Sequence, residues 1–341
     1  MRSDDRERAR DLVRGTEQDP LAPFVLRPEK EYVFSPDGHA AIGYARRLGV
    51  LVAGGDPVGE PDSWPAAMDE FAAQAGRGRF RHPIAVLGAG ERAKPMWERH
   101  GLRGIAIGRD VVISTGDFDL VGRKFRNVRQ GIQRSRNSGV TVSIWREGEL
   151  PADVLAALRG MERRLGRDPS RGFSMILGRM FDGSAPDAVV AVAFAPGTGS
   201  GVDGARGRVI GAHRYLPAGP DLSLDLPLRD HGAGNGVDER LTAEVVAWGR
   251  QNGVKRVSLA FAPFPDLFAV KEGSLPVRAA QRAAHVFDPM IHVERLYRYL
   301  RKFHAFGQQR YVMLRPAQIL WAAAAFILLE LGSYGRRARR G

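Results

Sequence analysis

Cysteine is absent from this 341-residue chain, and its absence excludes several kinds of chemistry at once. Without thiols there is no disulfide framework, no thiolate nucleophile and no cysteine-ligated metal. The eight histidines show no metal-ligand spacing such as H-E-x-x-H, and no Ser–His–Asp arrangement stands out. We therefore assign no metal and no cofactor, and we expect any reaction here to proceed without a covalent nucleophile. A chain without disulfides also fits a reducing compartment.

Long apolar runs are also scarce. Residues 1–20 are dense in both charge signs, so we expect a mobile segment over residues 1–24 rather than a secretory signal. The most apolar stretch, from Ala317 to Leu331, is shorter than the roughly 20 residues that span a bilayer. Residues 317–341 fit either a helix docked on the core or a helix lying on a membrane. The basic end, with Arg336, Arg337, Arg339 and Arg340, favours the membrane.

Acidic residues are outnumbered, since 38 Asp and Glu stand against 51 Lys and Arg and give a net charge of +13. A surplus of this size favours polyanionic partners, either nucleic acid or an anionic membrane surface. Between residues 121 and 145, the stretch from Arg123 to Arg136 holds six basic residues and no acidic one. Phe125, Val128 and Ile132 fall on one stripe there, which predicts an amphipathic connecting helix with a basic face. That face either contacts phosphates or is simply solvated.

The order of predicted elements repeats in the two halves of the chain. The first half contains a hairpin (Glu31–Phe34 and Ala40–Tyr44, around the turn SPDGH), a helix (Trp64–Ala75), a strand (Pro83–Leu87), a helix (Glu91–His100) and a strand (Gly104–Ile107). The second half contains strands Val209–Tyr215 and Leu222–Leu226, the loop HGAGNG, a helix (Val237–Gln251) and the strand KRVSLAFA. Two units with one order indicate a duplicated α/β fold, at residues 25–120 and 146–316.

One acidic residue and two loops are candidates for chemistry. Asp225 lies in the apolar strand LSLDL, so its carboxylate needs partners or a raised pKa. It is either a structural acid paired with an arginine or a functional acid at a strand end. The loops HGAGNG, before Val237, and DPVG, before Trp64, precede helix N-termini, which suit anions. Either loop equally fits a simple turn, and Asp56 is expected to shape the second.

Several motifs in residues 25–316 belong together. They are EKEYVFSPDGHAAIGY, GDPVG, the basic helix, RGFSMILGR, LSLDL, NGV at Asn235, RVSLAFA, LYRYLRKF and QQRYV. With these motifs the chain resembles the cytosolic C-terminal domain of the lysylphosphatidylglycerol synthases, the multiple peptide resistance factor family. The resemblance implies two tandem acetyltransferase-like (GNAT) units joined by the basic helix. It also implies transfer of an amino acid from aminoacyl-tRNA to a lipid hydroxyl, as on phosphatidylglycerol.

The resemblance suggests roles for individual residues. An aminoacyl ester is already activated, so the enzyme mainly needs positioning, a base and stabilisation of the oxyanion. Asp225 is the candidate for the base or for holding the substrate ammonium, and Arg229 would counter phosphate or developing charge. The substrate-binding candidates are Arg171, Ser174, Asn235, Lys302 and Arg310. The candidates for contacts with tRNA or lipid phosphate are Arg123, Lys124, Arg126 and Arg129. For Lys302 and Arg310, pairing with acids at the surface is the alternative.

Two motifs depart from the family pattern. The family usually continues LSLDL with Met-Arg-Arg, whereas Pro227-Leu228-Arg229 stands here, and Ala260 replaces an Asn found in many members. These departures leave open which amino acid is transferred. The many-helix flippase of other members is not part of these 341 residues, so lipid would be reached through the tail or a separate partner, such as a flippase. The expected location is the cytoplasmic face of the cell membrane, peripheral or monotopic.

Two other classes of function stay open. An acyl-coenzyme A-dependent N-acyltransferase shares the fold class, but it favours an Arg or Gln leading the glycine loop, and HGAGNG has no such residue directly before it. A non-catalytic module that binds membrane or nucleic acid would explain Pro227 and Leu228 as signs of a degenerate active centre.

Overall fold

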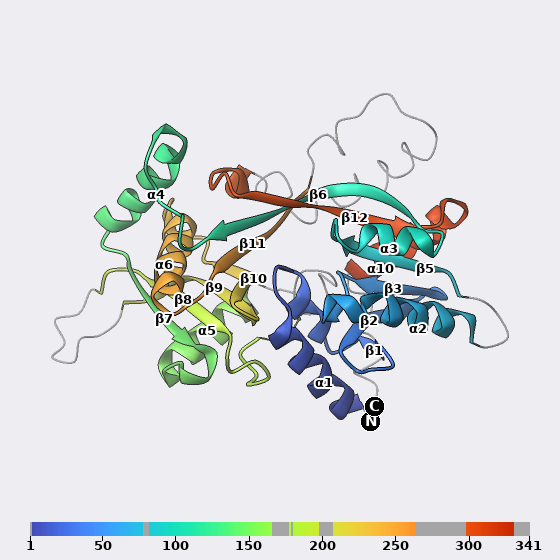
Figure 1. Ribbon diagram of the computed structural model, residues 1–341. Coiled ribbons are helices and arrows are strands. Elements are labelled where there is room, and N and C mark those ends of the chain that lie inside the picture. The colour runs from blue at the N-terminus through green and yellow to red at the C-terminus, as the bar shows by residue number, and fades with distance from the viewer. Residues whose placement is uncertain are drawn as a thin grey trace.

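A computed structural model describes residues 2–77, 82–165, 177–178, 180–197, 207–263 and 298–330 (Figure 1). The candidates Arg171 and Ser174 therefore lie outside the described residues, as does the arginine-rich end after residue 330. Within these limits, one mixed sheet of twelve strands runs through the whole molecule and helices cover both of its faces. This arrangement confirms the predicted α/β class.

The strands of the first half are β1 (Glu31–Phe34), β2 (Ala40–Arg47), β3 (Val50–Gly54), β4 (Val58–Gly59), β5 (Ile84–Ala89) and β6 (Arg103–Ser114). Those of the second half are β7 (Thr141–Arg146), β8 (Val189–Phe194), β9 (Val209–Ala218), β10 (Asp221–Arg229), β11 (Arg256–Pro263) and β12 (Phe306–Leu314). Their order in the sheet is β1-β2-β3-β5-β12-β6-β11-β10-β9-β8-β7, with β4 on β2. Among the strands of the described residues, only the pairs β3–β5 and β10–β11 are parallel.

The helices are α1 (Arg2–Gly15), α2 (Trp64–Gly76), α3 (Lys94–Arg99), α4 (Arg126–Asn137), α5 (Ala152–Arg164), α6 (Val237–Gln251) and α10 (Ile319–Glu330), with short 3-10 turns such as η1 (Ala22–Leu26) and η3 (Arg123–Phe125). The predicted helix over Val237–Gln251 is confirmed as α6. The predicted connecting helix is confirmed as η3 and α4, and its apolar stripe of Phe125, Val128 and Ile132 is buried.

The end of the chain returns to the first half. Strand β12 lies between β5 and β6, with Leu314 opposite both Ala85 and Arg103. Strand β6 also pairs with β11 along its far end, so the two halves share one uninterrupted sheet. The division into units at residues 25–120 and 146–316 stays a prediction, and the strand pairing crosses it, because β12 completes the first half.

The alternation of side chains along each strand assigns the helices to the two faces. In β3, Leu51 and Ala53 pack against α2, whereas Val50 and Val52 pack against α10. The segment around η1 packs on Ala41 of β2, on the same face as α10. The segment around η1 also packs on β9 of the second half, on the face of the sheet opposite α4 and α6. One face therefore carries α2, α3, α4 and α6, and the other carries α10, the N-terminal segment and α5.

The N-terminus differs from the expectation of a mobile segment over residues 1–24. Residues 2–15 form α1. Asp4 and Asp5 lie in its first turn, where their negative charges interact favourably with the helix dipole. Ala9 and Val13 are buried at 0% and 2% exposure. Three apolar side chains, Ala9, Leu12 and Val13, hold the helix, so the dense surrounding charge conceals it in the sequence.

The apolar stretch after residue 317 forms α10. Its inner face packs Ala322, Ala325 and Phe326 onto β2, β3 and β5, which is the core-docking alternative. Leu320 and Trp321 point outward instead, at 71% and 61% exposure. Among the described residues, no helix combines the length and the apolar character needed to cross a bilayer.

Candidate active site

Asp225 lies at a β-bulge in β10, where the pairing with β9 shifts between Leu224 and Leu226. Its Oδ2 accepts a hydrogen bond of 2.5 Å from Nη1 of Arg214, and Nε of Arg214 donates to Oε2 of Glu147 at 2.6 Å. All three side chains are at most 3% exposed. Asp225 therefore has the arginine partner that its place in an apolar strand requires.

The second oxygen of Asp225 fixes a neighbouring segment, because Oδ1 accepts a hydrogen bond of 2.7 Å from the backbone N–H of Leu177. Burial raises the pKa of Glu147 despite the nearby Arg214. Burial alone would lower the pKa of Arg214, but the charges of Asp225 and Glu147 outweigh it and raise that pKa. Within the described part of the chain, Nη2 of Arg214 and Oε1 of Glu147 are buried without a hydrogen-bond partner. The network thus retains polar capacity that a substrate or water can use.

A cavity of about 170 Å³ lies beside β10 on the same face of the sheet as Asp225. Its wall includes Asp221 and Ser223 of β10, Arg256 of β11 and Asp110 of β6. Arg256 donates two hydrogen bonds to Asp221, at 2.9 and 2.8 Å. The Ser223 hydroxyl is buried and has no partner among the described residues. Only Leu224 lies between Ser223 and Asp225 along β10, so polar groups continue from the cavity to the bulge.

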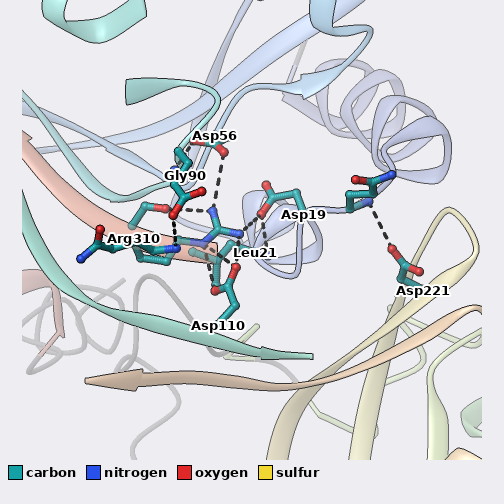
Figure 2. A network of polar contacts seen from close by, with 11 residues as sticks. Asp19, Leu21, Asp56, Gly90, Asp110, Asp221 and Arg310 are labelled. Carbon is teal, nitrogen blue, oxygen red and sulfur yellow. Dashed lines mark hydrogen bonds and ion pairs between the residues drawn. The ribbon is translucent and has the colours of Figure 1, made fainter. Parts of the chain in front are cut away.

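Arg310 lies next to this cavity, inside a cluster of carboxylates (Figure 2). Its Nε donates to both oxygens of Asp110 at 2.9 Å, and its Nη2 donates to Asp19 at 2.8 Å. Nη2 also forms an ion pair with Asp110 at 2.8 Å. Asp56 lies 3.6 Å from Nη1 and accepts a hydrogen bond of 2.8 Å from the Gly90 N–H. Burial, and then the charge of Asp19, raise the pKa of Asp56 to about 7. Asp56 thus connects its own loop to Gly90 and to Arg310, and its role in shaping the DPVG loop stays a prediction.

The Arg310 side chain is only 1% exposed. A phosphate would have to displace three carboxylates to reach its guanidinium, so the geometry does not support Arg310 as a substrate-binding residue. Burial alone would lower its pKa, but Asp110, Asp19 and Asp56 together raise it, and the group stays charged. The residue joins the N-terminal segment, two loops of the first half and β6.

Arg229 is not among the partners of Asp225 in the structure. Its Nη1 donates to Asp238 of α6 at 2.9 Å, and its Nη2 donates to the carbonyls of Ala233 and Gly234 at 3.0 Å. Arg229 thus holds the HGAGNG loop from a position two residues before it, a contact that the sequence analysis missed. Asp238 also contacts the buried His213 at 3.2 Å. Burial would raise the pKa of Asp238, but His213 and Arg229 lower it overall.

The remaining candidates lie around α6 and α4. Lys302 pairs with Glu239 at 2.6 Å, which is the predicted alternative of pairing with an acid. Asn235 is exposed in the loop before α6. Arg123, Lys124 and Arg126 are exposed, whereas Nη1 of the exposed Arg129 donates to the backbone carbonyls of Leu120 and Gly122. Apart from Arg171 and Ser174, which are not described, the candidates thus occupy separate places rather than one cluster.

The sequence analysis did not identify Arg214, Glu147, His213 and Asp238. For Arg214 a signal existed: it is a charged residue in the apolar strand VIGAHRYL, which pairs with LSLDL. The predicted roles of the candidate residues stay predictions.

Comparison with known proteins shows the family of the chain. The sequence profile described as the C-terminal domain of phosphatidylglycerol lysyltransferase matches residues 9–314. The chain belongs to this family.

Two relatives carry names that bear on the reaction. The MprF-like domain protein Rv1619 of Mycobacterium tuberculosis is 40% identical over 350 residues, which cover 98% of this chain and 69% of that protein. The lysylphosphatidylglycerol biosynthesis bifunctional protein LysX of Gordonia bronchialis is 34% identical, over 99% of this chain and 30% of LysX. The chain thus spans less than a third of the length of LysX.

Solved structures support the fold. The C-terminal domain named for lysylphosphatidylglycerol synthetase from Agrobacterium fabrum has a TM-score of 0.79 at 22% identity and covers 98% of this chain and 100% of that one. L-PGS from Bacillus licheniformis has a TM-score of 0.76 at 20% identity, with 97% of each chain covered. These matches confirm the fold class.

Proposed function

We propose that the chain transfers an amino acid from aminoacyl-tRNA to a hydroxyl of phosphatidylglycerol. The observation that carries the proposal is the family match across residues 9–314, together with relatives named for lysylphosphatidylglycerol biosynthesis. In this reaction the lipid hydroxyl attacks the ester carbonyl and a tetrahedral oxyanion forms. The terminal ribose oxygen of the tRNA then leaves and takes a proton, while the lipid hydroxyl loses one. One ester replaces another, so no further energy source is needed.

The Asp225 network and the cavity beside it are the proposed active centre. The cavity offers acidic and hydroxyl groups at Asp221 and Ser223 that suit an amino group. Asp225, at the bulge, would take part as the base or hold the ammonium. Because its side chain is buried with both oxygens hydrogen-bonded, it would first have to release Leu177 or Arg214. Its carboxylate also orders Leu177, so the variant test must separate chemistry from folding.

The geometry disfavours the acyl-coenzyme A alternative. A pyrophosphate would bind at the N-terminus of α6, behind the HGAGNG loop. Two acids, Asp238 and Glu239, occupy the first turn of this helix. They already engage Arg229, His213 and Lys302, and their charge opposes a second anion there.

The partners follow from the reaction. The substrates are a charged tRNA and an anionic lipid, and both match a chain with a net charge of +13. We propose that the protein works as a peripheral protein at the cytoplasmic face of the membrane. A separate flippase would move the product across the bilayer.

The experiment compares the full chain with Asp225→Asn on vesicles containing phosphatidylglycerol. The aminoacyl-tRNAs, beginning with lysyl-tRNA and alanyl-tRNA, are supplied in turn with labelled amino acids, and label in the lipid extract is measured. We expect transfer by the wild type and a loss of about a hundredfold or more in the variant. Asp230→Asn serves as the matched control, because Asp230 lies just after β10 and pairs with Arg208 near the surface.

Thermal unfolding is measured on the same preparations. Loss of transfer with an unchanged melting temperature supports a role in the chemistry. A large fall in melting temperature, with activity that follows the folded fraction, makes Asp225 a structural acid. No labelled lipid from the wild type with any aminoacyl-tRNA contradicts the proposed function and leaves a binding module.

A further inference from the structure

Three exposed apolar side chains lie at one end of the sheet. Leu48 is 49% exposed, Leu320 71% and Trp321 61%, and they are three of the five large hydrophobic residues exposed within the described residues. Leu48 occupies the turn between β2 and β3, and the other two lie in the first turn of α10. Single exposed apolar residues are ordinary, but an exposed Trp beside an exposed Leu on one helix marks a contact surface.

The strand registers place these residues at the same end. Arg47, just before Leu48, pairs with Val50, and the neighbouring Leu51 pairs with Ile84 at the start of β5. Leu314, at the end of β12, pairs with Ala85. Helix α10 begins five residues later, at the right-hand end of β12 in Figure 1. The β2–β3 turn and the first turn of α10 therefore lie at the same end of these strands, which we call this edge.

Basic residues surround this edge. Arg47 pairs in register with Val50, and Arg103 with Leu314, and both partners pack against α10, so these two arginines point to the α10 side. Arg315 directly follows β12 and donates to the His100 carbonyl at 3.4 Å. Arg103 and Arg315 are exposed, and Arg47 is half-buried. The acids Asp69 and Glu98 also lie toward this end, but they belong to α2 and α3 on the other face of the sheet and contact His100 and Lys94. On the α10 side, cations border the apolar side chains.

We propose that Leu48, Leu320 and Trp321, with Arg47, Arg103 and Arg315, form a docking surface for an anionic lipid bilayer; we call these six residues the α10 surface. Trp and Leu suit the boundary between headgroups and acyl chains, and arginines add attraction to lipid phosphates. The inner side of α10 is fixed on the core, so the outer side chains are presented without further folding. A nucleic acid would use the cations but not the Trp and Leu.

This inference rests on the proposed function and adds an orientation to it. The N-terminal segment shares a sheet face with α10, and Gln18 and Pro20 of that segment line the cavity next to β10. A bilayer lying on α10 is therefore on the same side of the sheet as the cavity and Asp225. The basic face of α4 lies at the opposite end of the molecule, where tRNA can approach separately (Figure 1).

The test is flotation of the full chain with vesicles, in the absence of tRNA. Vesicles of phosphatidylcholine with phosphatidylglycerol are compared with vesicles of phosphatidylcholine alone. We expect the wild type to float with the anionic vesicles. The double variant Leu320→Ser with Trp321→Ser should lose at least about tenfold in affinity for them. Arg103→Gln with Arg315→Gln weakens binding at low salt, and this difference shrinks at high salt. Val121→Ser is the matched control, because Val121 is 72% exposed but precedes α4.

Three results overturn the proposal. The first is a wild type that does not float with anionic vesicles. The second is a Leu320→Ser, Trp321→Ser variant that floats like the wild type. The third is that the main change in this variant is loss of a dimer, measured by light scattering. Should the double variant melt early, Leu48→Ser is used instead, since it lies in a surface turn. Transfer of labelled amino acid by the wild type is measured separately, so failure of docking and failure of the proposed function give different results.

Discussion

Two buried arginines, Arg214 and Arg310, differ in the number of carboxylates that surround them. Arg214 faces two, Asp225 and Glu147, whereas Arg310 faces three. One guanidinium cannot neutralise three carboxylates. In the Arg310 cluster the ionised form of an acid is therefore destabilised, which raises the pKa of that acid. Burial of charges carries a large desolvation cost, which makes this cluster sensitive to protonation.

The Arg310 cluster predicts a pH dependence of stability. Asp56 has its pKa raised by burial from 3.8 to about 7, so between these values the folded state holds a proton that the unfolded chain has lost. Stability contributed by this proton is present at acidic pH and is lost as pH rises to about 7. We expect Asp56→Asn to reduce this loss, measured as melting temperature from pH 5 to pH 8.

Asp37→Asn is the control for that experiment. Hydrogen bonds from Ser35, Ser63 and the His39 N–H lower the pKa of Asp37 to about 2. Its contribution is present above pH 3.8 and is lost only as pH falls toward 2, so the slope between pH 5 and pH 8 should stay that of the wild type. An Asp56→Asn variant with an unchanged slope contradicts the explanation.

At the scale of elements, the packing of α4 on α6 determines where the basic face points. A side chain on Gly236, at φ +98°, would place its Cβ 2.0 Å from the carbonyl oxygen of Gly131. The two helices therefore meet backbone to backbone, and Val128 and Ile132 are buried beside the contact. The basic residues Arg123, Lys124, Arg126 and Arg129 are left on the outside, at the start of the helix.

We predict that Arg123→Gln, Lys124→Gln and Arg126→Gln together weaken tRNA binding. Each phosphate contact that is lost should reduce the slope of log affinity against log salt by about 0.7 to 0.9. Arg129 is left in place because it holds the loop at Leu120 and Gly122. Filter binding over a salt series measures the effect.

The matched control replaces three other exposed arginines, Arg146, Arg163 and Arg164, which lie on β7 and α5. It lowers the net charge by the same amount away from α4. Equal loss of affinity in both triple variants indicates a general charge effect. Unchanged affinity in the first variant means that the face is only solvated.

At the scale of the whole molecule, segments from both end regions of the chain pack against the other half. The N-terminal segment packs on β9, and Asp221 accepts a hydrogen bond of 3.2 Å from the Gln18 N–H. Strand β12 and α10 complete the first half from the C-terminal side. The two halves therefore depend on one another for their cores.

We predict that residues 1–145 expressed alone do not fold, because β5 and β6 then lack the strand between them and α10 no longer covers β3. Co-expression with residues 146–341 should restore folded protein, measured by circular dichroism and cooperative thermal unfolding. Residues 1–145 with native-like cooperative unfolding on their own would contradict this dependence.

Local features were predictable from the sequence because they depend on residues close together in the chain. The helical spacing of Phe125, Val128 and Ile132 gave the buried side of the connector, and the turn SPDGH gave the β1–β2 hairpin. Composition excluded disulfides and thiolate chemistry. The combined motifs identified the family, and the charge of Asp225 within LSLDL required a partner in the core.

Which partners these groups meet was decided by tertiary structure. Asp225 meets Glu147 through Arg214 because β10 pairs with β9, and Arg310 meets Asp19 across 291 residues because β12 inserts between β5 and β6. The same pairing separates Arg229 from Asp225, although only three residues lie between them in the sequence. Strand pairing joins segments that are distant in the chain, and its register depends on the cores of both halves together. No pattern local to either strand contains that information.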